Sequence, residues 1–150
     1  TAPGLRWLDK RAVELGGGDT HRMALHDCVL IKDNHVRAFG DVSSCVQAAK
    51  GRASFVRKIE VEVSSPDAAA AAAEAGADIV MLDNMSREEI SAALDLLKER
   101  GLRDSVTVEA SGNVSLEEVR ELARLGVDVI SIGLLTHSPR AIDFKLRLMP

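Results

Sequence analysis

The chain has 150 residues, of which 46% are hydrophobic and 28% are charged, a balance that suits one globular domain and excludes intrinsic disorder. Its formal net charge of -4, with acids and bases interspersed, gives no basic face for nucleic acid and no polybasic patch for a membrane. No apolar run approaches the roughly 20 residues of a membrane helix, and residues 1–10 lack the features of a signal peptide. We therefore expect a cytoplasmic protein with no nucleic-acid or membrane partner.

The core has to be built from small and aliphatic side chains, because only 3% of the residues are aromatic. Such a core is typical of β/α proteins, whose strands are buried on both faces. Cys28 and Cys45 lie inside apolar patterns and lack the spacing of metal ligands or of a disulfide framework. We expect both cysteines to fill the core without a redox role.

Short apolar runs alternate with helical patterns along the chain. We expect strands over 28–31, 59–63, 79–82, 106–110 and 129–132, and helices over 5–15, 42–49, 67–75, 87–100 and 116–125. This alternation predicts parallel strands joined by crossovers. Because a complete eight-stranded barrel needs roughly 250 residues, the predicted fold class is α/β, a partial, open β/α barrel of TIM-barrel type over residues 1–150.

Capping residues and an internal repeat support these boundaries. Ser65 and Pro66 precede an alanine run, and Ser115 stands three residues before Glu118 in a capping-box pattern. The segment 61–65 is echoed by 108–112, and each copy is followed by a helix and then by Ala-Gly-Ala-Asp or Leu-Gly-Val-Asp. We interpret these copies as two successive β-α-β units.

Candidate cations come early in the chain. Three glycines, Gly16 to Gly18, lead to His21 and Arg22, and Lys32 directly follows the first expected strand. An imidazole, a guanidinium and an ammonium could together hold carboxylates. The glycine run could also be a simple connector, and Lys32 could pair with Asp33 or, if desolvated, act as a Schiff-base nucleophile. The spacing of His21, His26 and His35 does not suit a zinc site.

Candidate carboxylates and small residues follow the later strands. Glu60 and Glu62 share one face of a strand because side chains alternate, and Asp83 ends the next strand. Two carboxylates at neighbouring strand ends could coordinate Mg²⁺ or bind ribose hydroxyls, or could be neutralised by ion pairs. The segment Ser111-Gly112-Asn113 and Gly133 end the last two strands, where exposed backbone N–H groups often bind phosphate. The carboxyl ends of the strands, where barrel active sites are built, therefore gather Lys32, Glu62, Asp83, Ser111 and Gly133.

These segments together resemble quinolinate phosphoribosyltransferase, the carboxylating nicotinate-nucleotide pyrophosphorylase family. The resemblance covers nearly the whole chain in order, and it rests on these motifs: Pro3-Gly4-Leu5-Arg6, Gly16-Gly17-Gly18 with His21-Arg22, Leu30-Ile31-Lys32-Asp33-Asn34-His35, Glu60-Val61-Glu62-Val63, Ala75-Gly76-Ala77-Asp78, Leu82-Asp83-Asn84-Met85, Glu109-Ala110-Ser111-Gly112-Asn113, and Ser131-Ile132-Gly133 with Thr136-His137-Ser138.

The resemblance implies an enzyme of NAD biosynthesis that joins quinolinate to phosphoribosyl pyrophosphate with Mg²⁺, giving nicotinate mononucleotide, pyrophosphate and CO₂. It implies that His21, Arg22 and Lys32 bind quinolinate and that Glu62 and Asp83 bind ribose and the metal. It also implies a phosphate site at Ser111, Gly112, Asn113 and Gly133. Lys32, Glu62 and Asp83 would be the catalytic group.

The resemblance further implies a homodimer or higher homo-oligomer and an amino-terminal α/β domain. Thr1 matches the last residue of the family's Thr-Arg-Lys-Thr motif, so we expect residues 1–150 to be the C-terminal barrel domain, without that amino-terminal domain and inactive alone. Two alternatives stay open: another barrel enzyme that uses Lys32 as a Schiff base on a phosphorylated sugar, and a truncated, non-catalytic barrel that only assembles.

Overall fold

A computed structural model describes residues 1–149 and contains a five-stranded, all-parallel sheet in which each strand pairs with the next one along the chain. The strands are β1 (Val29–Ile31), β2 (Ile59–Val63), β3 (Ile79–Asp83), β4 (Thr107–Ser111) and β5 (Val129–Ile130). This sequential order is that of a β/α barrel left open after its fifth strand. The predicted fold class is confirmed.

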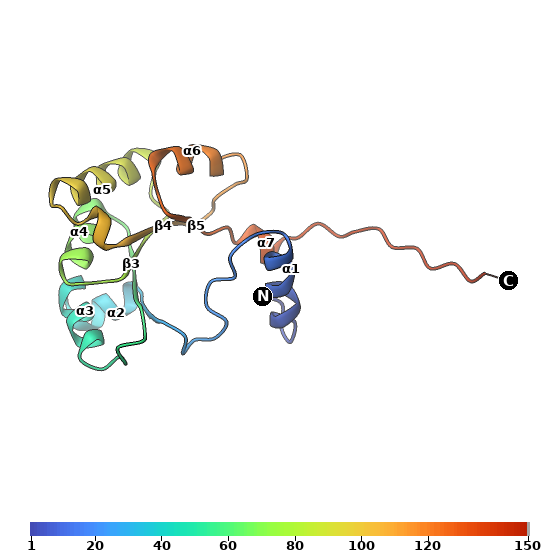
Figure 1. Cartoon of the computed structure of the whole chain (residues 1–150), viewed down its shortest axis with the longest axis horizontal. Helices are drawn as coiled ribbons and strands as arrows, with labels where there is room; N and C mark the ends of the chain where they lie inside the picture. The colour runs from blue at the N-terminus through green and yellow to red at the C-terminus, as the bar shows by residue number, and fades with distance from the viewer. Residues whose placement is uncertain (150) are drawn as a thin grey trace.

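The helices connect the strands, and α2 to α6 form an arc along one side of the sheet (Figure 1). The helical elements are α1 (Arg6–Leu15), α2 (Asp33–Phe39), α3 (Val42–Lys50), α4 (Pro66–Glu74), α5 (Arg87–Glu99), the 3₁₀ turn η1 (Arg103–Ser105), α6 (Val119–Leu125) and α7 (Leu134–His137). Residues of α1 and α7 line a common pocket away from that arc. Within residues 1–149, no helix combines the length and apolar character needed to cross a membrane.

The core lies between the sheet and this arc of helices. Helix α5 contributes Ile90, Ala93, Leu94 and Leu97 at spacings of three and four residues, which place them on one face. Helix α4 is capped by Ser65, whose Oγ accepts from the N–H of Ala68, and its buried alanines allow a close approach to the sheet. The side chains of β3 and β4 that face the helices are valine, leucine and alanine, and they are almost fully buried.

The internal repeat predicted two equivalent units, and the structure gives both copies the same strand-starting contact. The Asp78 carboxylate accepts from the N–H of Ile59 at 2.7 Å, and the Asp128 carboxylate accepts from the N–H of Val108 at 2.7 Å. The preceding glycines, Gly76 and Gly126, have φ angles of 89° and 95°, in the region that glycine tolerates best. The repeated Gly-X-Asp motif therefore ends a helix and aligns two neighbouring strands.

Helices α2 and α7 and the turn η1 were not expected from the sequence, and two expected elements are shorter than predicted. Helix α2 was not expected, because Asp33, Asn34 and His35 have low helix propensity; it forms with the Lys32 N–H donating to His35 Nδ1 at 2.9 Å. The helix expected over 116–125 begins only at Val119, because residues 116–118 form a turn in which the Ser115 Oγ and N–H both bond the Glu118 carboxylate. The strand expected over 129–132 covers only 129–130.

Candidate active site

The inner face of the sheet, opposite the helices of the core, carries a row of charged side chains. Parallel register aligns Glu62 of β2 with Met81 of β3, and Met81 with Glu109 of β4. Since alternate residues share a face, Glu60 lies on the same face one step closer to the start of β2. Glu60 and Glu109 are 0% and 2% exposed, so this face is a buried acidic surface that needs partners.

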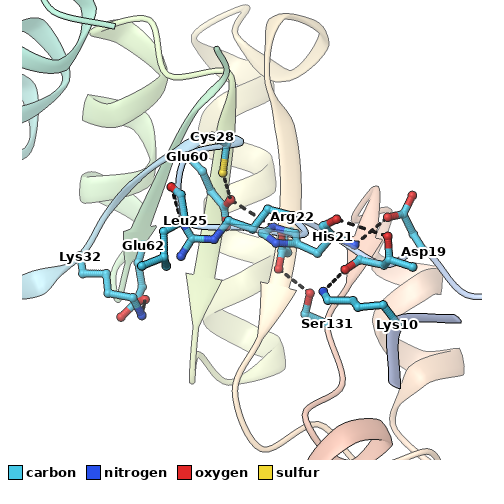
Figure 2. A network of polar contacts seen from close by, with 12 residues as sticks. Lys10, Asp19, His21, Arg22, Leu25, Cys28, Lys32, Glu60, Glu62 and Ser131 are labelled. Carbon is cyan, nitrogen blue, oxygen red and sulfur yellow. Dashed lines mark hydrogen bonds and ion pairs between the residues drawn. The ribbon is translucent and has the colours of Figure 1, made fainter. Parts of the chain in front are cut away.

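His21 supplies that partner from the segment between α1 and β1, which crosses this face (Figure 2). Its Nε2 lies 3.1 Å from Glu60 Oε2 and 3.8 Å from Glu109 Oε2. His21 has a φ of 52°, and its N–H donates to Asp19 Oδ1 at 2.8 Å, while Lys10 donates to the neighbouring Thr20 carbonyl. The turn after the glycine run therefore aims the imidazole at the two carboxylates.

The protonation of this cluster is set by its surroundings. The hydrogen bond from His21 to Glu60 outweighs the opposing effect of burial and raises the pKa of His21 above 6.5. Burial raises the pKa of Glu109, the nearby Glu60 charge adds to that rise, and the hydrogen bond from Ser131 Oγ at 2.5 Å opposes it. The contact with Glu60 therefore favours the protonated form of the imidazole.

Sequence reasoning placed Glu60 beside Glu62 but assigned roles to neither Glu60 nor Glu109 at this site. The sequence did hold a signal for them, because a glutamate in a central strand that is buried on both faces requires a partner.

The two cysteines lie in different surroundings. Cys45 lies in the core as predicted. The prediction that Cys28 fills the core was wrong, because this residue is only partly buried and its Sγ lies 3.7 Å from Glu60 Oε2 beside the polar cluster. Burial, followed by the Glu60 charge, raises the pKa of the Cys28 thiol.

Lys32 leaves β1 at its carboxyl end and pairs with Glu62 rather than with Asp33. Its Nζ donates to Glu62 Oε2 at 2.8 Å, with the lysine side chain 51% exposed. Asp33 instead pairs with Arg37 at 3.4 Å. Because Lys32 is half-exposed and paired with a carboxylate, its surroundings suit a charged side chain that binds an anion. They do not suit the neutral amine that a Schiff base requires.

The ends of β3 and β4 form a second polar group. Register places Asp83 beside Ser111, and Asn84 Nδ2 donates to Asp83 Oδ2 at 3.0 Å while Asn113 Nδ2 donates to Asn84 Oδ1 at 2.9 Å. A Cβ on Gly112 would stand 2.5 Å from the Asn84 side chain, so glycine is required for this close approach. Ser111, Gly112 and Asn113 also border a pocket of about 290 Å³.

Arg22 and Gly133 are the remaining predicted residues, and Arg22 lies beside Cys28. Arg22 Nη1 is 3.5 Å from the Leu25 carbonyl, and its side chain runs from the His21 side of the site toward Lys32 and Glu62 (Figure 2). Arg22 also lines a pocket of about 230 Å³ together with Arg6 and Lys10, two cations that the sequence prediction did not include. Gly133 begins α7, where its carbonyl accepts from the N–H groups of Thr136 and His137.

Two donor sets could hold a divalent cation. Glu62 and Asp83 offer carboxylate oxygens on one face of neighbouring strands, a donor set that suits Mg²⁺ when substrate phosphates complete the coordination. His21, Glu60 and Glu109 place one ligand atom each within 4.8 Å of one another. In this second set the imidazole already contacts Glu60 Oε2 at 3.1 Å, whereas Glu60 Oε1 is buried and has no hydrogen-bond partner among residues 1–149.

Comparison with known proteins gives a consistent result. The family model "Quinolinate phosphoribosyl transferase, C-terminal domain" matches residues 1–147. The chain is 51% identical over 148 residues to a probable nicotinate-nucleotide pyrophosphorylase [carboxylating] of Methanothermobacter thermautotrophicus, covering 99% of this chain and 53% of that protein. It is 45% identical over 148 residues to the human nicotinate-nucleotide pyrophosphorylase [carboxylating], covering 99% of this chain and 49% of the human protein.

The fold is also that of a solved structure. NadC from Streptococcus pyogenes superposes with a TM-score of 0.88 at 43% identity, covering 98% of this chain and 50% of that one. The chain thus spans about half the length of the relatives that it matches.

Proposed function

The chain belongs to the quinolinate phosphoribosyl transferase family, as a C-terminal domain, and we propose that it carries the reaction centre of a carboxylating nicotinate-nucleotide pyrophosphorylase. In this reaction quinolinate and phosphoribosyl pyrophosphate give nicotinate mononucleotide, pyrophosphate and CO₂. The observation that carries the proposal is the grouping of His21, Lys32, Glu62 and Asp83 on one face of the sheet, in a chain whose relatives bear that activity in their names.

Quinolinate is a dianion, and His21, Arg22 and Lys32 supply three cations for its two carboxylates. The His21 side chain is 35% exposed, so a substrate carboxylate can reach the imidazole while the other edge of the ring stays on Glu60. Lys32 would exchange its Glu62 partner for a substrate carboxylate. Charge-assisted hydrogen bonds of this kind contribute about 1.5–3 kcal/mol each.

Glu62 and Asp83 are the proposed ribose and metal ligands, and both are carboxylates at the ends of neighbouring strands. Mg²⁺, when bound there, would neutralise the charge of the departing pyrophosphate. The same carboxylates would stabilise positive charge that develops on the ribose. Ser111, Gly112, Asn113 and Gly133 are the proposed phosphate-binding residues.

The chemistry has two steps. The lone pair of the pyridine nitrogen forms a bond to ribose C1 while the bond from C1 to the pyrophosphate oxygen breaks, and pyrophosphate leaves with that electron pair. The ring is then a pyridinium, which accepts the electron pair released when the bond to the adjacent carboxylate breaks. CO₂ departs, and the ring carbon takes up a proton. His21 and Lys32 orient the carboxylates so that the ring nitrogen faces C1.

The alternatives make different demands on Lys32. A Schiff-base enzyme needs a neutral lysine, whereas this ammonium donates to Glu62 at 2.8 Å. A non-catalytic barrel would not need an imidazole held at hydrogen-bond distance from a buried carboxylate. The homo-oligomer and the cytoplasmic location belong to the same proposal.

The test is formation of nicotinate mononucleotide, measured by chromatography with quinolinate, phosphoribosyl pyrophosphate and Mg²⁺. The chain is assayed alone and mixed with the remaining half of the Methanothermobacter relative, because the relatives are about twice as long. Product in either arrangement supports the proposal. Quinolinate binding without product in both would favour the non-catalytic barrel, and a borohydride-trapped adduct at Lys32 would favour the Schiff-base enzyme.

A further inference from the structure

The carboxylate of Glu60 is buried with one of its two oxygens unpaired. The residue is 0% exposed. Its Oε2 lies 3.1 Å from His21 Nε2 and 3.7 Å from Cys28 Sγ, whereas Oε1 has no hydrogen-bond donor in the part of the chain that the structure describes. A buried acceptor without a donor is costly, and in folded proteins it commonly marks the place of a bound water or ion. This oxygen therefore points to a ligand.

The unpaired oxygen belongs to a group of three metal-ligating side chains on the inner face of the sheet. His21 Nε2, one oxygen of Glu60 and one of Glu109 all lie within 4.8 Å of one another, and Nε2 is 3.1 Å and 3.8 Å from the two carboxylates. Zinc binds nitrogen and oxygen donors at about 2.0–2.2 Å, so two of its tetrahedral ligands lie about 3.4 Å apart. The two measured separations bracket this value, and an ion could contact all three donors after modest side-chain shifts.

The charge of the group suits a divalent cation. Two ionised carboxylates carry two negative charges, and an imidazole binds metal in its neutral form. Among residues 1–149, His21 is the only basic side chain within ion-pair distance of either glutamate. The neighbouring cations turn to backbone oxygens instead: Lys10 donates to the Thr20 carbonyl and Arg22 to that of Leu25. A divalent ion would therefore neutralise two carboxylates for which the chain supplies one imidazole.

We propose that His21, Glu60 and Glu109 form a binding site for one divalent transition-metal ion of the zinc class, with the remaining position taken by water. The donor set separates this site from the proposed Mg²⁺ ligands Glu62 and Asp83. Imidazole is a ligand for zinc and its neighbours, whereas Mg²⁺ prefers oxygen donors. Zinc on Nε2 would leave the ring proton on Nδ1, as a donor for a substrate carboxylate. The site is thus compatible with the proposed function and does not depend on it.

The groups behind the ligands hold them in place. Ser131 Oγ donates to Glu109 Oε1 at 2.5 Å and so orients the other oxygen, which faces His21 (Figure 2). The His21 N–H donates to Asp19 Oδ1 at 2.8 Å and fixes the turn that carries the imidazole. Hydrogen bonds that orient metal ligands in this way raise metal affinity roughly 10–100-fold. The His21 side chain is 35% exposed, which gives an ion a route to the buried carboxylates.

The experiment titrates the chain with ZnCl₂ by isothermal calorimetry in excess MgCl₂, which occupies sites built from oxygen donors alone. We expect one Zn²⁺ per chain. His21→Gln and Glu60→Gln should each weaken this binding more than tenfold, because loss of even an orienting hydrogen bond costs roughly 10–100-fold, and Ser131→Ala should weaken it about tenfold. His26→Gln is the matched control: His26 also lies beside a carboxylate, that of Asp27 at 3.6 Å, but its side chain is 79% exposed, so the affinity should not change.

The cysteine beside the site needs its own control, because thiolates also bind zinc. Cys28 Sγ contacts Glu60 but is not one of the three grouped donors, so Cys28→Ser should keep the zinc affinity of the parent chain. Co²⁺ serves as a spectroscopic probe of the same site, and its spectrum should lack a sulfur-to-metal charge-transfer band. Loss of zinc binding in Cys28→Ser, or the appearance of that band, would overturn the assignment of the ligands.

Nitrogen NMR of the unmodified chain gives a measurement that does not require a variant to fold. The chain has four histidines, and Zn²⁺ should shift the Nε2 signal of His21 while those of His26, His35 and His137 stay in place. No uptake of Zn²⁺ in excess Mg²⁺, equal weakening in the His26→Gln control, or a zinc-induced shift confined to another histidine would contradict the proposal. All these outcomes are measured without quinolinate, so failure of the zinc site leaves the proposed function standing.

Discussion

Replacement of Lys32 by alanine tests the proposed quinolinate site most sharply. In the free protein the ammonium is bonded to Glu62 at 2.8 Å, so binding a substrate carboxylate exchanges one ionic partner for another. A charge-assisted hydrogen bond contributes about 1.5–3 kcal/mol, and loss of the Glu62 contact offsets part of this gain. We therefore expect Lys32→Ala to weaken quinolinate binding by about tenfold, at the lower end of the range that the bond alone would give.

The assay is isothermal calorimetry with quinolinate and, separately, with phosphoribosyl pyrophosphate, whose affinity should change much less. Lys98→Ala is the matched control, because Lys98 also pairs with a carboxylate, Asp95 at 3.3 Å, and is 59% exposed, but lies on the outer helix α5. Equal loss of both ligands in Lys32→Ala, or an equal effect of Lys98→Ala, would refute the assignment.

Four further outcomes are expected. Asp83→Asn should depress turnover and alter its Mg²⁺ dependence with quinolinate affinity nearly intact; an unchanged metal response would contradict the metal role. Gly112→Ala should weaken phosphoribosyl pyrophosphate binding selectively, since its Cβ would collide with Asn84; unchanged affinity in calorimetry would argue against the phosphate site. Asp128→Ala should lower the free energy of unfolding in urea by about 1–3 kcal/mol, because the buried N–H of Val108 loses its acceptor; a smaller loss would refute the strand-starting role. The pKa of His21 is raised in the native state, so protonation of His21 stabilises the folded protein fully below about pH 6.5, and this stabilisation is lost as pH rises through the native pKa. The urea midpoint of unfolding, measured upward from about pH 6, should therefore fall in the parent chain and fall less in His21→Gln.

The fold was largely predictable because its signals are local. Apolar runs bounded by glycine, serine and aspartate placed β2, β3 and β4 within a residue of their observed limits, and alternation with helices required a parallel sheet. Helix α2 was missed because its first residues, Asp33, Asn34 and His35, are poor helix formers, and its start depends on a bond between the Lys32 N–H and His35. Such a bond is not apparent from propensity.

The candidate site was predictable in its residue types but not in its pairings. The alternation of side chains placed Glu60 and Glu62 on one face. The local sequence, however, does not show that Glu60 contacts His21, 39 positions earlier in the chain, or that Lys32 pairs with Glu62 rather than with the adjacent Asp33. These pairings follow from register and from the path of residues 16–28 across the sheet, which are properties of the folded chain. Glu109 was missed for the same reason.

Release of CO₂ from quinolinate labelled in the carboxylate next to the ring nitrogen tests the central claim most directly, because loss of that group requires the pyridinium formed by ribosyl transfer. With Mg²⁺ and phosphoribosyl pyrophosphate, and with the remaining half of the relative supplied, labelled CO₂ and pyrophosphate should appear in equal amounts, and both should fall in the Lys32→Ala and Asp83→Asn variants. Labelled CO₂ without phosphoribosyl pyrophosphate, or no labelled CO₂ although both substrates bind, would contradict the account.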